Sequence, residues 1–110
     1  MQVQAISNQN FQGSVTFSKD ISPKLVGYLS EVSEKSGIAK KPYNLQVQNT
    51  KDKRFLSIEA INPENLTEKY TVLVHKFLQK KDILHSAVKD AMSNFEKSQS
   101  LPQKNLNKVI

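Results

Sequence analysis

The chain has no cysteine and only three glycines. Without cysteine, neither a disulfide framework nor a thiolate metal site can hold the fold together, so its stability must come from packing. The glycines, Gly13, Gly27 and Gly37, are too far apart to form a phosphate-binding loop, and no Gly-Lys-Ser or Gly-Lys-Thr run follows them. The composition therefore argues against a nucleotide hydrolase, and the missing thiols fit a reducing compartment.

Long apolar runs are also missing. No stretch approaches the roughly 18 to 20 consecutive apolar residues that a membrane-spanning helix needs. Residues 1–13 contain no lysine or arginine and no continuous apolar run, so they lack both the charged and the hydrophobic parts of a signal peptide. We therefore expect a cytoplasmic protein that does not contact a membrane.

Polarity divides the 110 residues into three segments. Residues 1–13 are rich in Gln, Asn and Ser, and residues 99–110 combine Ser, Pro, Gln, Asn and Lys with isolated apolar positions. Both compositions are typical of flexible ends. Between them, apolar residues recur periodically, and the length leaves room for one core. We predict a flexible leader (1–13), a single domain (14–98) and a flexible tail (99–110).

Two segments have helical periodicity and start signals. Ser22 can cap a helix whose first position is Pro23, and Gly37 offers a left-handed stop. We predict helices over residues 23–36 and 83–97, the second capped by Asp82. Gly27 lies inside the first helix, where it costs about 1 kcal/mol relative to Ala. We expect close contact with another element to explain this glycine.

Four other runs are rich in β-branched and aromatic residues, and they predict strands over residues 14–18, 43–48, 54–61 and 70–77. The last three form the simplest arrangement, an antiparallel meander. A hairpin loop joins the first two of them, and a longer connection over 62–69 joins the next pair, because Pro63 blocks continued pairing. The resulting β-α-β-β-β-α order predicts a small α+β domain with an antiparallel sheet and two helices packed on one face.

Alternation along these strands separates two faces of the sheet. The helices are expected to cover the apolar face, which comprises Tyr43, Leu45, Val47, Leu56, Ile58, Ala60, Tyr70, Val72 and Val74. The opposite face mixes polar residues with Phe55, Leu73 and Phe77. Two interpretations are open: the leader or tail covers these three side chains, or they bind a protein partner or a second copy of the chain.

Signs of catalysis or metal binding are few. The two histidines, His75 and His85, lack metal-ligand spacing, and no Gly-x-Ser-x-Gly turn is present to hold a nucleophile. The carboxylates fall mostly at expected helix surfaces and turns, and Glu59 alone lies inside an expected strand. We therefore expect no enzyme, no cofactor, no metal and no small-molecule substrate.

Positive charge is the remaining signal, because the net charge is +6. The excess is spread thinly along the chain, so the sequence shows no basic stripe. Lys80 and Lys81 nevertheless stand where the second helix begins. An anion there would meet two ammonium groups and free backbone N–H groups, so the pair is a candidate phosphate site.

The order helix, three antiparallel strands, helix resembles the double-stranded-RNA-binding domain. In that family a K-K-x-A-x-x-x-A-A-x-x-A-L-x-x-L run opens the last helix, and here Lys80-Lys81 is followed at matching offsets by Ile83, Ala87-Val88, Ala91-Met92 and Phe95. The resemblance covers residues 22–95. It implies phosphate contacts at Lys80 and Lys81, with the first helix around Lys24, Glu31 and Lys35 facing a minor groove. The family's glycine-proline-x-histidine loop is absent from residues 49–54.

The sequence therefore predicts a non-enzymatic binding module. The first hypothesis is contact with another protein, or self-association, through Phe55, Leu73 and Phe77. The alternative hypothesis is weak binding of duplex RNA through Lys80, Lys81 and Lys24.

Overall fold

In the part of the chain that the structure describes, five strands form one sheet whose spatial order, β2-β3-β4-β5-β6, is also their order along the chain. The computed structural model describes residues 13–98 and 105–109. Its strands are Val15–Phe17 (β2), Asn44–Asn49 (β3), Phe55–Asn62 (β4), Asn65–His75 (β5) and Asn105–Val109 (β6). Its α-helices are Pro23–Lys35 (α1) and Lys81–Ser98 (α2), and short 3-10 helices occupy Ile38–Lys40 (η2) and Lys76–Leu78 (η3).

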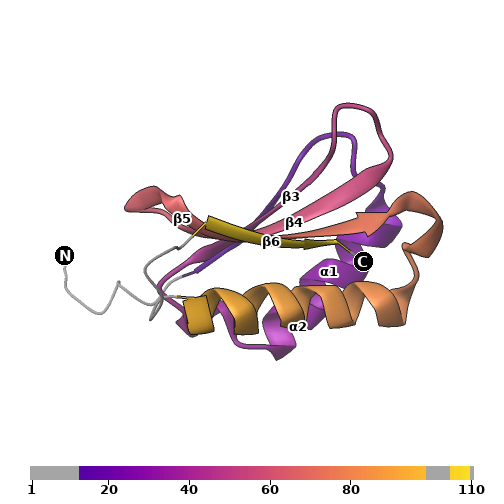
Figure 1. Cartoon of the computed structure of the whole chain (residues 1–110). Helices are drawn as coiled ribbons and strands as arrows, with labels where there is room; N and C mark the ends of the chain where they lie inside the picture. Colours follow the sequence, from indigo (N-terminus) through magenta and orange to yellow (C-terminus); the bar gives the residue numbers. More distant parts are fainter. Residues whose placement is uncertain (1–12, 99–104, 110) are drawn as a thin grey trace.

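The sheet has parallel edges and an antiparallel centre. β2 pairs with β3 and β5 with β6 in parallel, whereas β3, β4 and β5 form the antiparallel meander. Helix α1 connects the first parallel pair and α2 the second. β3 and β5 run in the same direction, and both crossovers step the same way across the sheet. Two crossovers of the same handedness therefore place both helices on one face of the sheet, as Figure 1 shows.

This arrangement confirms the predicted small α+β domain with both helices packed on one face of the sheet. The prediction of a purely antiparallel sheet is wrong, because both edge strands are parallel to their neighbours. The tail prediction is also wrong for Asn105–Val109, which pair with β5 between Lys69 and Leu73. The predicted leader lies outside the described residues, apart from Gly13.

Gly13 lies tightly against the segment that leads into β3. A Cβ atom at this position would stand 2.5 Å from the carbonyl oxygen of Ile38 and 3.0 Å from that of Lys41, and it would meet the carbonyl oxygen of Tyr43 as well. Real Cβ atoms do not approach carbonyl oxygens this closely, so only glycine fits without movement of the backbone. The start of the described chain is therefore fixed to the domain.

The hydrophobic core lies between the sheet and the two helices. Alternate residues of the central strands point into it, and a stripe of helical spacing on α2 meets them: Leu84, Ala87, Val88, Ala91, Met92 and Phe95. Eight of the nine residues predicted for the covered face are buried, and the ninth, Tyr70, is half-buried and packs against the core. The predicted division of the sheet into two faces is confirmed.

The helix boundaries follow the predictions closely, with two corrections. Ser22 caps α1 by accepting the N–H of Leu25 at 3.4 Å, and Gly37 has a left-handed φ of 79°. The contact expected at Gly27 does not exist, since a Cβ there would meet nothing within 4 Å. Helix α2 begins at Lys81, so Asp82 lies in its first turn and is not its cap.

Strand β5 also differs from its predicted extent. It begins at Asn65, directly after a two-residue turn at Pro63 and Glu64, so the long connection predicted over 62–69 is wrong. It ends at His75, and Phe77 therefore belongs to η3 and not to the strand. Because β5 ends before Phe77, the alternation of the strand does not determine where the side chain of Phe77 points.

Candidate functional site

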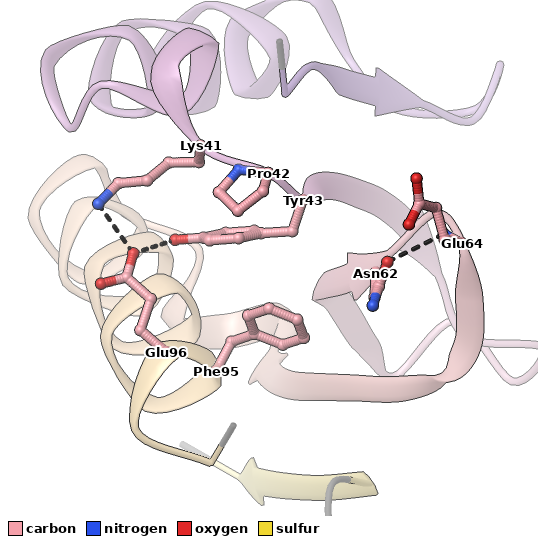
Figure 2. A pocket seen from close by; sticks show the side chains of 7 residues that line it. All are labelled: Lys41, Pro42, Tyr43, Asn62, Glu64, Phe95 and Glu96. Atoms are coloured by element: carbon pink, nitrogen blue, oxygen red, sulfur yellow. Dashed lines mark hydrogen bonds and ion pairs between the residues drawn. The ribbon is translucent and has the colours of Figure 1, made fainter. Parts of the chain in front are cut away.

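One cavity, of about 360 Å³, opens between α2, the segment before β3 and the β4–β5 turn. Figure 2 shows its seven lining residues: Lys41, Pro42, Tyr43, Asn62, Glu64, Phe95 and Glu96. The rings of Tyr43 and Phe95 lie 4.6 Å apart at their centroids and are almost fully buried. They form a floor that belongs to the core.

The polar groups of this cavity bind one another. The Tyr43 hydroxyl donates to the carboxylate of Glu96, which also forms an ion pair of 3.0 Å with Lys41. Burial, together with the bond to Glu96 and its charge, raises the pKa of the Tyr43 hydroxyl far above its ordinary value. Burial raises the pKa of Glu96 too, but its bonds to Tyr43 and Lys41 outweigh this and keep the value below normal. The network fastens the segment before β3 to α2.

A second candidate site lies on the open face of the sheet, at the end where β5 stops. The register of β4 and β5 pairs Phe55 with His75 and Ser57 with Leu73, and alternation places all four residues on the face away from the helices. Phe55 and Leu73 are half-buried, and Ser57 is buried. Phe77 follows from η3.

Three rings form a row across this end of the sheet. The centroids of Phe55 and His75 lie 5.4 Å apart in an edge-to-face arrangement, and those of His75 and Phe77 lie 5.0 Å apart in a stack. We call Phe55, Leu73, His75 and Phe77 the aromatic patch. Phe77 is 73% exposed. Val109, which pairs with Leu73 in the register, is 59% exposed.

Backbone contacts hold the exposed ring in place. The N–H of Phe77 donates to Nδ1 of His75 at 3.2 Å. The N–H of Lys76 donates to the carbonyl of Arg54 at 2.8 Å. The turn that carries Phe77 is therefore tied both to the end of β5 and to the loop before β4.

Four cations lie in the two chain segments next to the aromatic patch, the loop that leads into Phe55 and the turn that carries Phe77. We call Lys51, Lys53, Arg54 and Lys76 the basic rim; the first three belong to the β3–β4 loop, and the last is in η3. The Lys76 ammonium lies 5.2 Å from the ring centroid of Phe77. Within residues 13–98 and 105–109, neither Lys51 nor Lys76 forms an ion pair, and Arg54 is 3.9 Å from Asp52. The fold thus brings Lys76 to a loop whose three cations are already neighbours in the sequence.

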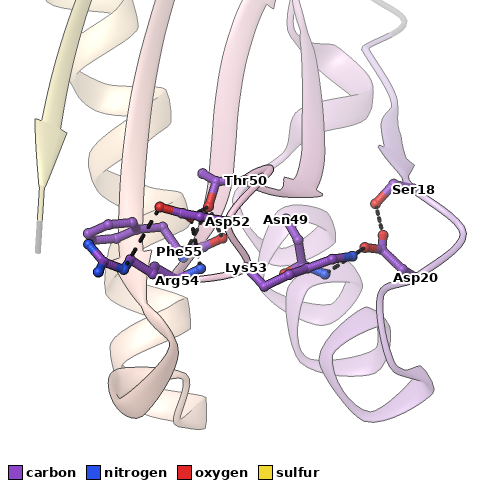
Figure 3. A network of polar contacts seen from close by, with 8 residues as sticks. All are labelled: Ser18, Asp20, Asn49, Thr50, Asp52, Lys53, Arg54 and Phe55. Carbon is purple, nitrogen blue, oxygen red and sulfur yellow. Dashed lines mark hydrogen bonds and ion pairs between the residues drawn. The ribbon is translucent and has the colours of Figure 1, made fainter.

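The loop that carries the rim is ordered by two carboxylates, as Figure 3 shows. Asp20 accepts hydrogen bonds from Asn49, Lys53 and Ser18, which together hold the pKa of its carboxyl far below normal. Asp52 accepts from the Thr50 hydroxyl at 2.7 Å and from the backbone N–H of Arg54 at 3.1 Å.

These contacts support an unusual backbone. Lys53 has a left-handed φ of 63°, which is uncommon for a residue other than glycine. Its ammonium lies 2.7 Å from Asp20. The ion pair therefore links this strained position to the turn after β2.

The helix face brings together part of the predicted RNA site. The ammonium groups of Lys24 and Lys81 each lie 5.9 Å from the ring centroid of Tyr28. Glu31, however, forms ion pairs with Lys35 at 3.0 Å and with Lys81 at 3.8 Å. The bond and charge of Lys35, then the charge of Lys81, lower the pKa of Glu31. A carboxylate therefore stands among the predicted phosphate ligands, while Lys80 lies exposed just before α2.

Other sites offer less. In the described part of the chain, no three His, Cys, Asp or Glu side chains gather as metal ligands. Among the same residues, no helix has the length and apolarity to cross a bilayer. Nε2 of His85 is buried without a hydrogen-bond partner there, but no cavity described for this fold is lined by it.

Comparison of the chain with protein families, with characterised proteins and with solved structures finds no match. The chemistry of the surface therefore has to support the functional argument.

Proposed function

We propose that this protein is a non-enzymatic binding module whose contact surface is the aromatic patch. The observation behind the proposal is Phe77, a large apolar ring that is 73% exposed and yet held by a stack and a hydrogen bond to His75. Burying such a ring removes apolar area from water, and a ring that is already fixed loses little conformational freedom on binding. Rigid exposed aromatics are typical anchors of binding surfaces.

The proposal retains Phe55, Leu73 and Phe77, the residues that the sequence favours for contact with another protein or a second copy. It adds His75, which joins the two phenylalanine rings. Binding of duplex RNA through Lys24, Lys80 and Lys81 stays the alternative. The ion pair between Glu31 and Lys81 weighs against it, because a phosphate would have to displace the carboxylate.

A photocrosslinking experiment tests the contact surface. Benzoylphenylalanine is placed at position 77 in the full chain, and Leu66 provides the matched control position because it is 62% exposed near the opposite end of β5. Both proteins are irradiated pure and in lysate, with and without nuclease. The pure sample detects a second copy, and nuclease separates nucleic-acid adducts from protein adducts.

We expect an adduct from position 77. An excess of unmodified protein should compete for the partner and remove the adduct, whereas an excess of the Phe77→Ser protein should not. Position 66 should give little of it. The proposal is wrong if position 77 yields no adduct that the unmodified protein competes for, or if positions 66 and 77 give the same adducts in the same amounts.

A further inference from the structure

We infer that the aromatic patch and the basic rim together bind single-stranded nucleic acid, with bases stacked on Phe77 and phosphates at Lys51, Arg54 and Lys76. The inference rests on the proposed function, since it names the partner class of the same surface. It places nucleic-acid binding on the open face of the sheet and not on the helix face.

The cations of the rim are of the kind that phosphate binding uses. Three of the four are lysines, which are depleted in protein–protein interfaces but supply phosphate contacts to many nucleic-acid-binding proteins. Lys51 and Lys76 form no ion pair in the described part of the chain, and the Arg54 side chain is 71% exposed. A phosphate can approach Lys51 and Lys76 without displacing a carboxylate, whereas at Arg54 it would compete with Asp52 at 3.9 Å.

The carboxylates of the same region are already engaged. Asp20 accepts from Lys53, Asn49 and Ser18, and Asp52 accepts from Thr50 and the Arg54 backbone. Their hydrogen bonds shape the loop while the remaining cations stay exposed. On the helix face, Glu31 lies among the cations themselves, 3.0 Å from Lys35 and 3.8 Å from Lys81.

The ring of Phe77 lies next to Lys76, and the backbone of Arg54 binds the same turn. Its Lys76 neighbour stands 5.2 Å from the ring centroid, and Arg54 is hydrogen-bonded to the Lys76 backbone. Every nucleobase has a π-face, so a ring beside cations binds single strands with little sequence preference. Exposed Gln46 and Gln48, on the same face of β3, add amide groups that can reach base edges.

Single strands fit this surface better than duplexes. In a duplex both faces of an internal base are already stacked, so Phe77 has no ring to contact. In a single strand the bases are unpaired, so one base can stack on the Phe77 ring while a neighbouring phosphate contacts the cations of the basic rim.

The test is fluorescence anisotropy of the full chain with labelled oligouridine and oligothymidine of about 16 nucleotides at about 50 mM salt. We expect binding that weakens as salt rises, and weaker binding to a duplex of the same length. Phe77→Leu should lower the affinity roughly tenfold with the salt slope unchanged, because only stacking is lost.

Two double variants remove the same charge from different places. Lys51→Gln with Lys76→Gln should weaken binding and reduce the salt slope by about one per lysine. Lys24→Gln with Lys81→Gln is the matched control and should change the affinity less than twofold. Thermal unfolding of each variant verifies that these exposed substitutions leave the domain folded.

The inference is overturned by any of three results: no binding at low salt, equal effects of the two double variants, or an unchanged affinity of Phe77→Leu. If oligonucleotides do not bind but position 77 still gives a competed protein adduct, the nucleic-acid inference falls and the proposed function stands. If the crosslink fails as well, both fall.

Discussion

The imidazole of His75 stacks on the ring of Phe77 with centroids 5.0 Å apart, while its Nδ1 accepts the backbone N–H of the same residue at 3.2 Å. One side chain thus fixes both the ring and the backbone of its neighbour. Without it, an exposed residue directly after a strand would sample several positions. The two contacts explain how Phe77 can be both exposed and ordered.

The first prediction concerns this pair. His75→Phe keeps a ring for stacking but removes the acceptor for the Phe77 N–H. We expect the Phe77 amide to exchange with solvent deuterium at least several-fold faster, and the domain to lose no more than about 1 kcal/mol of stability. Hydrogen exchange followed by NMR measures this, with the Leu84 amide as the unaffected reference. An unchanged exchange rate at Phe77 would show that the bond to His75 does not order the turn.

A second prediction follows from the empty space around Gly27. Because a Cβ there meets nothing within 4 Å, Gly27→Ala gains helix propensity without a clash. We expect the free energy of unfolding to rise by about 0.5 to 1 kcal/mol, measured by urea denaturation. A loss of stability would contradict the open surroundings of this position.

Gly13 should respond in the opposite direction to the same substitution. An alanine Cβ would collide with the carbonyl oxygens of Ile38 and Tyr43. We expect Gly13→Ala to lower the unfolding free energy by about 1 kcal/mol or more, or to detach the start of the chain and speed amide exchange at Ser14. Stability and exchange equal to those of the unaltered protein would mean that residue 13 is not docked as described.

Acid stability should depend on Asp20. Hydrogen bonds from Asn49, Lys53 and Ser18 place its native pKa below the unfolded value. The ionised Asp20 carboxylate therefore stabilises the fold at pH values above the ordinary Asp pKa of about 3.9. This contribution to the free energy of unfolding is lost as the pH falls toward the lower pKa of the native state.

Asp20→Asn removes the titrating carboxyl while keeping the side-chain size. We expect it to be less stable than the unaltered chain at neutral pH, and the difference to shrink as the pH falls below 4. Urea midpoints across that range measure the effect. A difference that is constant with pH would contradict the assigned role of the carboxylate.

Local patterns are sufficient to predict much of this fold. Alternation in β3, β4 and β5 identifies the buried face because both helices pack on that side of the sheet. It also places Phe55 and Leu73 on the open face. Phe77 is correctly chosen as a surface residue but for the wrong reason, since it lies in η3 after the strand has ended.

The features that the sequence does not reveal depend on contacts between distant segments. Lys76 joins the rim because its backbone binds Arg54, and no local pattern records that pairing. The polar segment Asn105–Val109 is short and lacks a continuous apolar face, yet backbone pairing with β5 makes it an edge strand. Asp20 shows no signal of its own until folding brings Asn49 and Lys53 to it.

A crosslinking scan of the full chain tests whether the aromatic patch is the contact surface. The photoreactive residue is placed in turn at positions 73 and 77 on the open face and at positions 24, 66 and 81 elsewhere. We expect competed adducts from positions 73 and 77, and little adduct from the other three positions. Adducts concentrated at positions 24 and 81 would contradict this expectation and would place the contact surface on the helix face.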